Sequence, residues 1–155
     1  MISWMKKAAL LLFLAGLASC DRTDAATGAA PKASPDAPLE IDMLEFGNFE
    51  YVERSPLPVR VTRWNGKRVR ATGFMNPGRQ IRDVKEFELV MNKDTCCYGS
   101  RPKMNHFFQV ILKEGSTTVY QSDPVTIVGK FVIDEQWDGD WQLGLYWLKE
   151  AKVVK

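Results

Sequence analysis

Apolar and polar residues alternate in short segments along most of the chain, which is the pattern of half-buried β-strands. In segment 66–75, Val69, Ala71 and Gly73 fall on one face, and two arginines and a threonine fall on the other. In segment 85–92, a phenylalanine and a leucine alternate with glutamates in the same way. We expect strands at 66–75, 85–92, 105–113, 116–121, 123–134 and 141–155. Because helical periodicity is nearly absent, the predicted fold class is all-β.

Two of these segments carry a glycine in the middle of a β-branched run, at Gly73 and Gly129. A glycine inside a strand often marks a bulge or a barrel corner. Two bent strands in one small domain predict a closed or partly open barrel, and an OB-like Greek key is the preferred architecture. The sequence WDGDW at 137–141 indicates a tight hairpin turn, with its two tryptophans as flanking packing residues.

The first residues have the pattern of a targeting segment. The start, MISWMKK, is positively charged, and the apolar run that follows is too short to span a bilayer. The run ends in Leu17-Ala18-Ser19-Cys20, which looks like the lipobox of bacterial lipoproteins. We therefore expect residues 1–19 to be a lipoprotein signal peptide and Cys20 to be lipidated. A plain secretory leader with a chance cysteine is the alternative.

This leader predicts a location in a bacterial envelope, facing the periplasm and anchored to a membrane. Asp21 favours the inner membrane over the outer one, and the choice between the two stays open. Residues 20–38 are rich in Ala, Pro, Ser, Thr and Asp and hold no large apolar residue, so they are predicted to form a flexible linker. Residues 39–155 are then a single β-barrel domain.

Charge narrows the choice of partner. The net charge of +2 is too small to imply nucleic-acid binding, and an exported lipoprotein rarely meets nucleic acid, so no such partner is expected. Residues 54–85 nevertheless hold nine basic residues and one acid. This stretch could face anionic lipid headgroups or an acidic partner. It could equally be a solvated surface paired with the acidic segments at 40–53 and 134–140.

The stretch KDTCCYGSRPKMNH at 93–106 holds the chain's only histidine and two of its three cysteines. Thiolate, imidazole and thioether groups suit Zn²⁺ or Cu⁺, so Cys96, Cys97, His106 and Met104 form a candidate metal site. On an extended strand, His106 would share a face with Met104 and Phe108. The adjacent cysteines argue against a chelate, because neighbouring side chains of an extended backbone diverge.

Two other interpretations of this stretch remain open. The cysteines could form a strained vicinal disulfide, which is more easily reduced and would suit a thiol redox protein. Alternatively the stretch is a structural loop, in which Asn105 hydrogen-bonds backbone and His106 is a satisfied core histidine. Such a loop can still bind a partner, and its candidate contact residues are Tyr98, Gly99, Arg101 and Asn105.

Several motifs together resemble one protein family. In chain order they are WNGKRVRATGFMNP, VKEFELV, CCYGSRPKMNHFFQV, PVTIVGKFVI and LGLYWL, and the pattern as a whole covers about residues 57 to 154. The pattern resembles the uncharacterised bacterial exported proteins catalogued as domain of unknown function 3299. The resemblance implies no established activity. It implies an envelope setting, with an export-type transporter or another envelope protein as a possible partner.

The sequence contains neither a GxSxG nor an HExxH motif and only one histidine, so enzymatic activity is not predicted. The leading hypothesis is a membrane-anchored lipoprotein that acts as a non-enzymatic binding or accessory module of the cell envelope, with no cofactor expected. The alternatives are a Zn or Cu handling protein that uses Cys96, Cys97 and His106, and a thiol redox protein.

Overall fold

A computed structural model of the chain describes residues 37–76, 78–93 and 102–154. Residues 33–155 form a compact unit of their own. The buried hydrophobic core of the described part lies entirely within this unit. Within the described part, no helix is long and apolar enough to cross a membrane.

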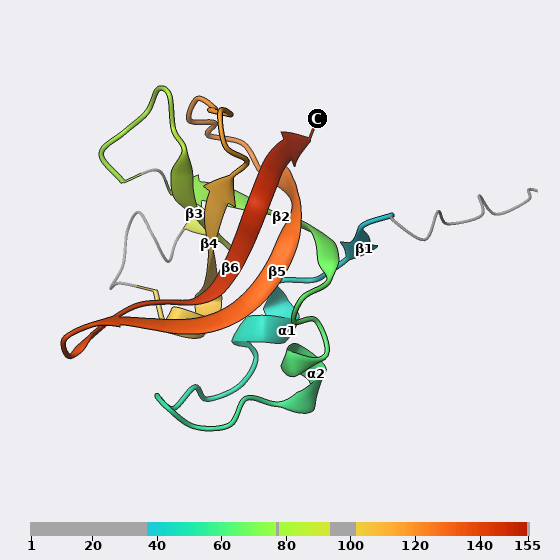
Figure 1. The fold of residues 1–155 in the computed structure, drawn as a ribbon, viewed down its shortest axis with the longest axis vertical. Helices are drawn as coiled ribbons and strands as arrows, with labels where there is room; N and C mark the ends of the chain where they lie inside the picture. Colours follow the sequence, from blue (N-terminus) through green and yellow to red (C-terminus); the bar gives the residue numbers. More distant parts are fainter. Residues whose placement is uncertain (1–36, 77, 94–101, 155) are drawn as a thin grey trace, which may run out of the picture. The chain divides into compact units, whose positions relative to one another are not determined.

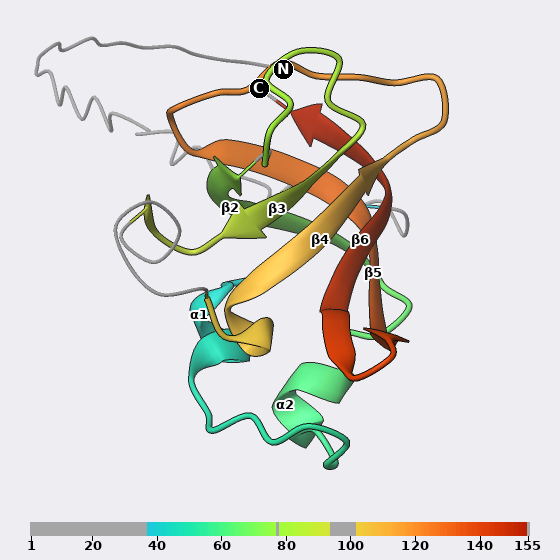
Figure 2. The ribbon, with the colours of Figure 1, turned by 90° about the vertical axis from the view of Figure 1, so that its left-hand side faces the viewer.

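Six strands of this unit form one mixed sheet that closes on itself (Figures 1 and 2). They are β1 (Leu39–Glu40), β2 (Arg68–Asn76), β3 (Glu86–Val90), β4 (Phe107–Leu112), β5 (Val125–Asp138) and β6 (Trp141–Val154). The spatial order is β1-β2-β3-β4-β6-β5, and β2 also pairs with β5. The strands β2 to β6 therefore pair in a ring.

The pairing directions around the ring identify its topology. β4 and β6 run parallel, while the other four pairs in the ring are antiparallel. A five-stranded ring with this order and one parallel pair is the Greek key of the OB fold. The predicted all-β class and OB-like barrel are confirmed. The ring is uneven, because β2 pairs with β5 over six residues and with β3 over only three.

The two strand glycines have the roles that their positions predicted. β2 pairs with β5 up to Gly73 and with β3 from Phe74 onward, so the strand changes neighbours at this glycine. A Cβ on Gly73 would lie 2.7 Å from the Val90 carbonyl oxygen. Gly129 lies opposite a register shift between β5 and β6, where a Cβ would lie 3.1 Å from that of Ala151. Both glycines permit close approach at bends of the barrel.

Three short helices lie outside the strands. They are α1 (Leu44–Gly47), α2 (Val59–Thr62) and the 3₁₀ helix η1 (Met104–His106). Figure 2 places α1 and α2 below the lower end of the barrel. The Asp42 carboxylate accepts a hydrogen bond from the backbone N–H of Leu44, the first residue of α1. Sequence periodicity missed these helices because an element of three or four residues is about one turn.

Two predicted strands differ from the structure. Segment 116–121 forms no strand and contributes only an isolated bridge between Thr118 and Val84. Segment 105–113 begins as the 3₁₀ helix η1 and becomes a strand only at Phe107. Met104, His106 and Phe108 therefore do not share one strand face, and that expectation was wrong. The predicted hairpin at 137–141 is present, with Asp138 paired to Trp141 and Gly139 at φ 60°.

Four aromatic rings form the centre of the core. Phe46 of α1 meets Phe108 of β4, Phe131 of β5 and Tyr146 of β6, and all four side chains are fully buried. The ring centroids of all six pairs lie between 5.1 and 5.7 Å apart. Such tilted and edge-to-face pairs add to the free energy of burial. Through Phe46, α1 is part of the barrel core.

The bend at Gly73 generates a first prediction. Replacing Gly73 with Ala forces a Cβ against a backbone carbonyl and against Leu89 and Met43, whose nearest atoms lie 3.0 Å away. We expect the free energy of unfolding to fall by about 1–3 kcal/mol, which urea denaturation of residues 33–155 measures. Gly129→Ala is the matched control and should cost less, because its nearest contacts lie at 3.1 to 3.3 Å. Equal losses for the two variants would contradict this account of the bend.

Candidate functional site

The described part of the 93–106 stretch packs against α1. Asn105 is fully buried in η1. Its side-chain amide donates to the backbone carbonyls of Phe46, Gly47 and Phe49, at distances of 3.4, 3.5 and 3.1 Å. The last carbonyls of a helix lack partners within the helix. Asn105 therefore completes the end of α1, and this buried position shows a structural role for a residue predicted to be a binding contact.

His106 lies beside the same turn but is only half-buried. Burial lowers the pKa of His106, the nearby Lys103 ammonium lowers it further, and the Gly47 backbone partly opposes both effects. The imidazole is therefore mainly neutral at pH 7, which is the form that binds a metal ion. The fully buried residue of this segment is Asn105, so the interpretation of His106 as a core histidine was wrong.

Gly47 brings a methionine and the histidine together. The Met91 sulfur and the His106 Cδ2 atom lie 3.2 and 3.3 Å from the point where a Cβ of Gly47 would sit. Met91 and Met104 are both partly buried and pack against the core, whereas Met75 lies inside it. The structure therefore places the Met91 thioether, directly after β3, and the His106 imidazole against the same glycine. Sequence spacing alone could not single out Met91 among several methionines.

The other predicted site residues cannot be placed. Cys20, Cys96, Cys97, Tyr98, Gly99 and Arg101 lie outside the described residues. Within the described ranges, no three or more His, Cys, Asp or Glu side chains gather as a metal site. The metal, redox and binding-loop hypotheses for the two cysteines therefore remain predictions.

A different surface is formed by the β5–β6 hairpin, which extends beyond the barrel (Figure 1). A hydrogen bond joins its two strands, because the Trp147 indole N–H donates to the Asp134 backbone carbonyl at 2.7 Å. The loop after α1 also holds it. The Tyr51 hydroxyl accepts a 2.7 Å bond from the buried Gln142 amide and donates to Glu135 at 3.3 Å. The Arg54 guanidinium lies 4.5 Å from the Trp137 ring centroid.

The tip of this supported hairpin exposes large apolar side chains. Trp141 is 73% exposed and Leu143 is 44% exposed. The prediction that Trp141 is a packing residue was wrong, whereas Trp137 does pack, against Arg54. Exposed tryptophans on a fixed scaffold are typical of contact surfaces with partners. Trp141 directly follows the turn residue Asp140, and no sequence signal distinguishes an exposed tryptophan at this position from a packed one.

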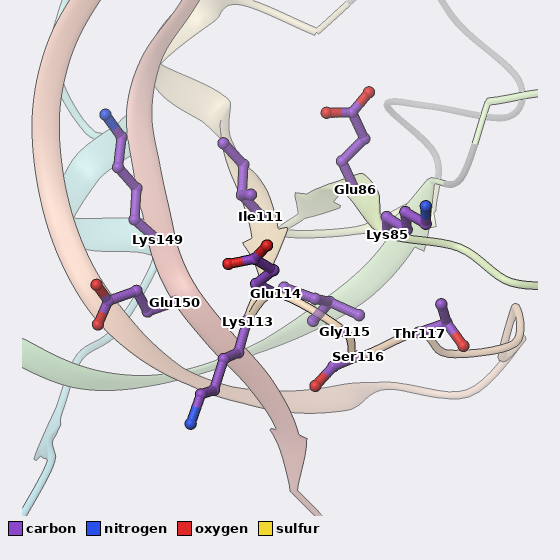
Figure 3. Close-up of a pocket in the computed structure, with 11 residues that line it drawn as sticks. Lys85, Glu86, Ile111, Lys113, Glu114, Gly115, Ser116, Thr117, Lys149 and Glu150 are labelled. Carbon is purple, nitrogen blue, oxygen red and sulfur yellow. The ribbon is translucent and has the colours of Figure 1, made fainter.

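A shallow groove of about 810 Å³ lies beside the end of β4 and the neighbouring part of β6 (Figure 3). It follows a register shift between Val110 and Leu112, and Glu150 beside it has φ 51°, a left-handed value that is unfavourable for a non-glycine residue. Ile111 and Leu112 supply apolar surface. The charged lining is balanced and consists of Lys85, Glu86, Lys113, Glu114, Lys149 and Glu150. Because the positive and negative charges are equal in number, the groove favours neither an anionic nor a cationic ligand. The hairpin is therefore the stronger candidate surface.

Comparison with known proteins gives one structural likeness. The chain is similar to the crystal structure of a DUF3299 family protein from Pseudomonas aeruginosa PAO1, with 20% identity and a TM-score of 0.47. The match covers 81% of this chain and 90% of the other. No family model and no curated protein sequence matches the chain. The family printed for that protein is the one that the sequence motifs resemble, and a likeness at this level carries no argument about this chain.

The helix-capping role of Asn105 generates a second prediction. Asn105→Ala removes a buried donor shared by three backbone carbonyls, and we expect it to lower the free energy of unfolding by about 1–3 kcal/mol. Urea denaturation measures the loss. Asn76→Ala is the control, because Asn76 donates to the Glu88 carboxylate in a part-buried pair and should cost less. A loss at Asn105 no larger than that at Asn76 would contradict the capping role.

Proposed function

We propose that this chain is a bacterial lipoprotein, exported and anchored to a membrane through Cys20, that acts as a non-enzymatic binding or accessory module of the cell envelope. The leader supports export and anchoring, because its apolar run ends at a lipobox-like Leu17-Ala18-Ser19-Cys20. The observation that carries the binding role is Trp141, which is 73% exposed at the tip of a braced hairpin.

The hairpin is suited to binding because its geometry is fixed before a partner arrives. Tyr51 and Arg54 contact its strands from the loop after α1, and the Trp147–Asp134 hydrogen bond joins the two strands. A pre-organised contact surface loses little conformational entropy on binding. In OB folds, the loop between the last two strands commonly contributes to ligand binding, which is an analogy at the level of the fold.

The surroundings of Trp141 define the chemistry of the partner. Asp138 and Asp140 flank the turn, and Glu135 lies on the adjoining arm. An apolar contact with acidic neighbours fits a partner that presents an apolar cleft edged by basic groups. We assign this role to an envelope protein, and a transporter component is the candidate that the family resemblance implies.

Photo-cross-linking in cells tests this proposal. With p-benzoylphenylalanine at position 143, we expect one defined adduct in the membrane fraction, and Trp141→Ala should remove it without changing the unfolding midpoint. Cys20→Ser should shift the protein out of the membrane fraction when the membranes are washed at high salt, which removes electrostatic contacts. The control probe replaces Val119, an exposed apolar residue outside the hairpin, and should give no such adduct. The absence of an adduct at 143, or equal adducts at 143 and 119, would reject the hairpin as the contact.

A second candidate function is the handling of Zn²⁺ or Cu⁺. The observation that favours it is the meeting of Met91 and His106 at Gly47, with the imidazole held neutral. Thioether and imidazole are ligands that suit Cu⁺, and thiolates from Cys96 and Cys97 would complete a soft site.

Native mass spectrometry of reduced residues 33–155, offered Zn²⁺ or Cu⁺, tests the metal candidate. Metal handling predicts one bound ion that is lost in Cys96→Ser and in Cys97→Ser and weakened in His106→Gln. If Met91 is a ligand, Met91→Leu weakens binding as well, while Met75→Leu in the core serves as the control. No bound ion, or an ion retained by both cysteine variants, would exclude this candidate.

A further inference from the structure

Basic side chains gather on the outer surface of β2, β5 and β6. Arg68, Lys130 and Lys149 form one row, because Arg68 pairs with Lys130 and Lys130 pairs with Lys149 across neighbouring strands. Arg70 and Lys152 form a second row on either side of Val128. We call these five residues, together with Lys67 in the turn before β2, the basic face.

The burial pattern shows that these side chains point away from the core. Val69, Ala71, Phe131, Leu148 and Ala151 alternate with them along the three strands and are buried. Val128 is also buried although it lies between Arg70 and Lys152 on the outer surface. The aliphatic stems of long basic side chains can cover such a residue while their charges remain in water.

The charges of this face are poorly compensated. Like charges directly opposite each other on neighbouring strands repel. Within the described part of the chain, Arg68, Lys130 and Lys152 have no ion pair. The charged atoms of Arg70 and Glu40 are 3.6 Å apart, and those of Lys149 and Asp134 are 3.8 Å apart. Both ion pairs are exposed to solvent, so they contribute little to stability. Glu150 is the remaining acid on these strands next to the face, and it forms no ion pair with it.

The connection to the N-terminal segment meets the same part of the sheet. β1 pairs with β2 at Val69 and Arg70, so the described domain begins beside the basic face. The acidic residues Asp138 and Asp140 lie at the far end of β5 and β6, at the hairpin turn. Charge is therefore separated along these strands, with the cations nearest to the incoming chain.

We propose that the basic face docks the domain onto an anionic lipid surface, with phosphate-bearing headgroups neutralising Arg68, Lys130 and Lys152. The docking is a separate electrostatic contact, and it does not require lipidation of Cys20. Juxtamembrane basic residues bind anionic membranes in this way, and the attraction weakens within about 10 Å at 0.1 M salt.

Vesicle sedimentation of residues 33–155 tests the docking without the leader. The probes are phosphatidylcholine vesicles with and without phosphatidylglycerol, at low and high salt. We expect sedimentation with the phosphatidylglycerol vesicles at low salt and its loss at high salt. The variant Arg68→Gln, Lys130→Gln, Lys152→Gln should lower the affinity about tenfold or more.

The matched control neutralises three exposed basic residues elsewhere, as Arg82→Gln, Lys85→Gln, Lys113→Gln, and changes the net charge equally. It should keep most of the binding, and circular dichroism should show that both variants remain folded. Equal losses in both variants would reduce the effect to net charge and overturn the proposal. The absence of binding to anionic vesicles would also overturn it, and binding to polyglutamate in their place would point to an acidic protein partner.

Discussion

The contact between Phe46 and the three aromatic rings of the barrel organises the rest of this fold. A sheet that closes into a small ring still has open ends, and its lower end must be covered by apolar surface. Phe46 does this from a helix of only one turn, and removing a buried phenylalanine of this kind typically costs about 3–5 kcal/mol. A helix so short has no stability of its own, so its position depends on this contact and on Asn105.

The packing of α1 against the barrel also leaves two buried polar groups without a hydrogen-bond partner among the described residues. Tyr146 contributes its ring to the cluster, but its buried hydroxyl has no hydrogen-bond partner among the described residues. Burial raises the pKa of Tyr146 far above its usual range, so the hydroxyl stays protonated at any physiological pH. The side-chain amide oxygen of Asn105, Oδ1, is likewise buried and has no hydrogen-bond partner within the described part. Both groups sit around α1, where aromatic packing outweighs incomplete hydrogen bonding.

Sequence patterns predicted the barrel well because barrel strands have a strict period of two. Val69, Ala71 and Gly73 alternate with polar residues, and the glycine showed where β2 bends. They could not predict α1, because Phe46 lies in a segment too short for helical periodicity. They also misplaced Trp141, because a tryptophan beside a turn looks the same in sequence whether its hairpin packs on the barrel or extends beyond it.

The candidate surfaces were less predictable because they depend on which strands become neighbours. The basic stretch 54–85 was visible in sequence, but Lys130, Lys149 and Lys152 join Arg68 and Arg70 only through the pairing of β5 with β2 and β6. Arg60 and Arg63 of that stretch instead contact the helical end, where they bind the Asn48 carbonyl and Glu45. The Greek-key order thus divides one basic segment between two surfaces. It also assembles a new row of cations from three segments that are distant in sequence. The row of cations and the hairpin tip lie on the same two strands, β5 and β6. A membrane or protein that binds one of them therefore limits the directions from which a partner can reach the other.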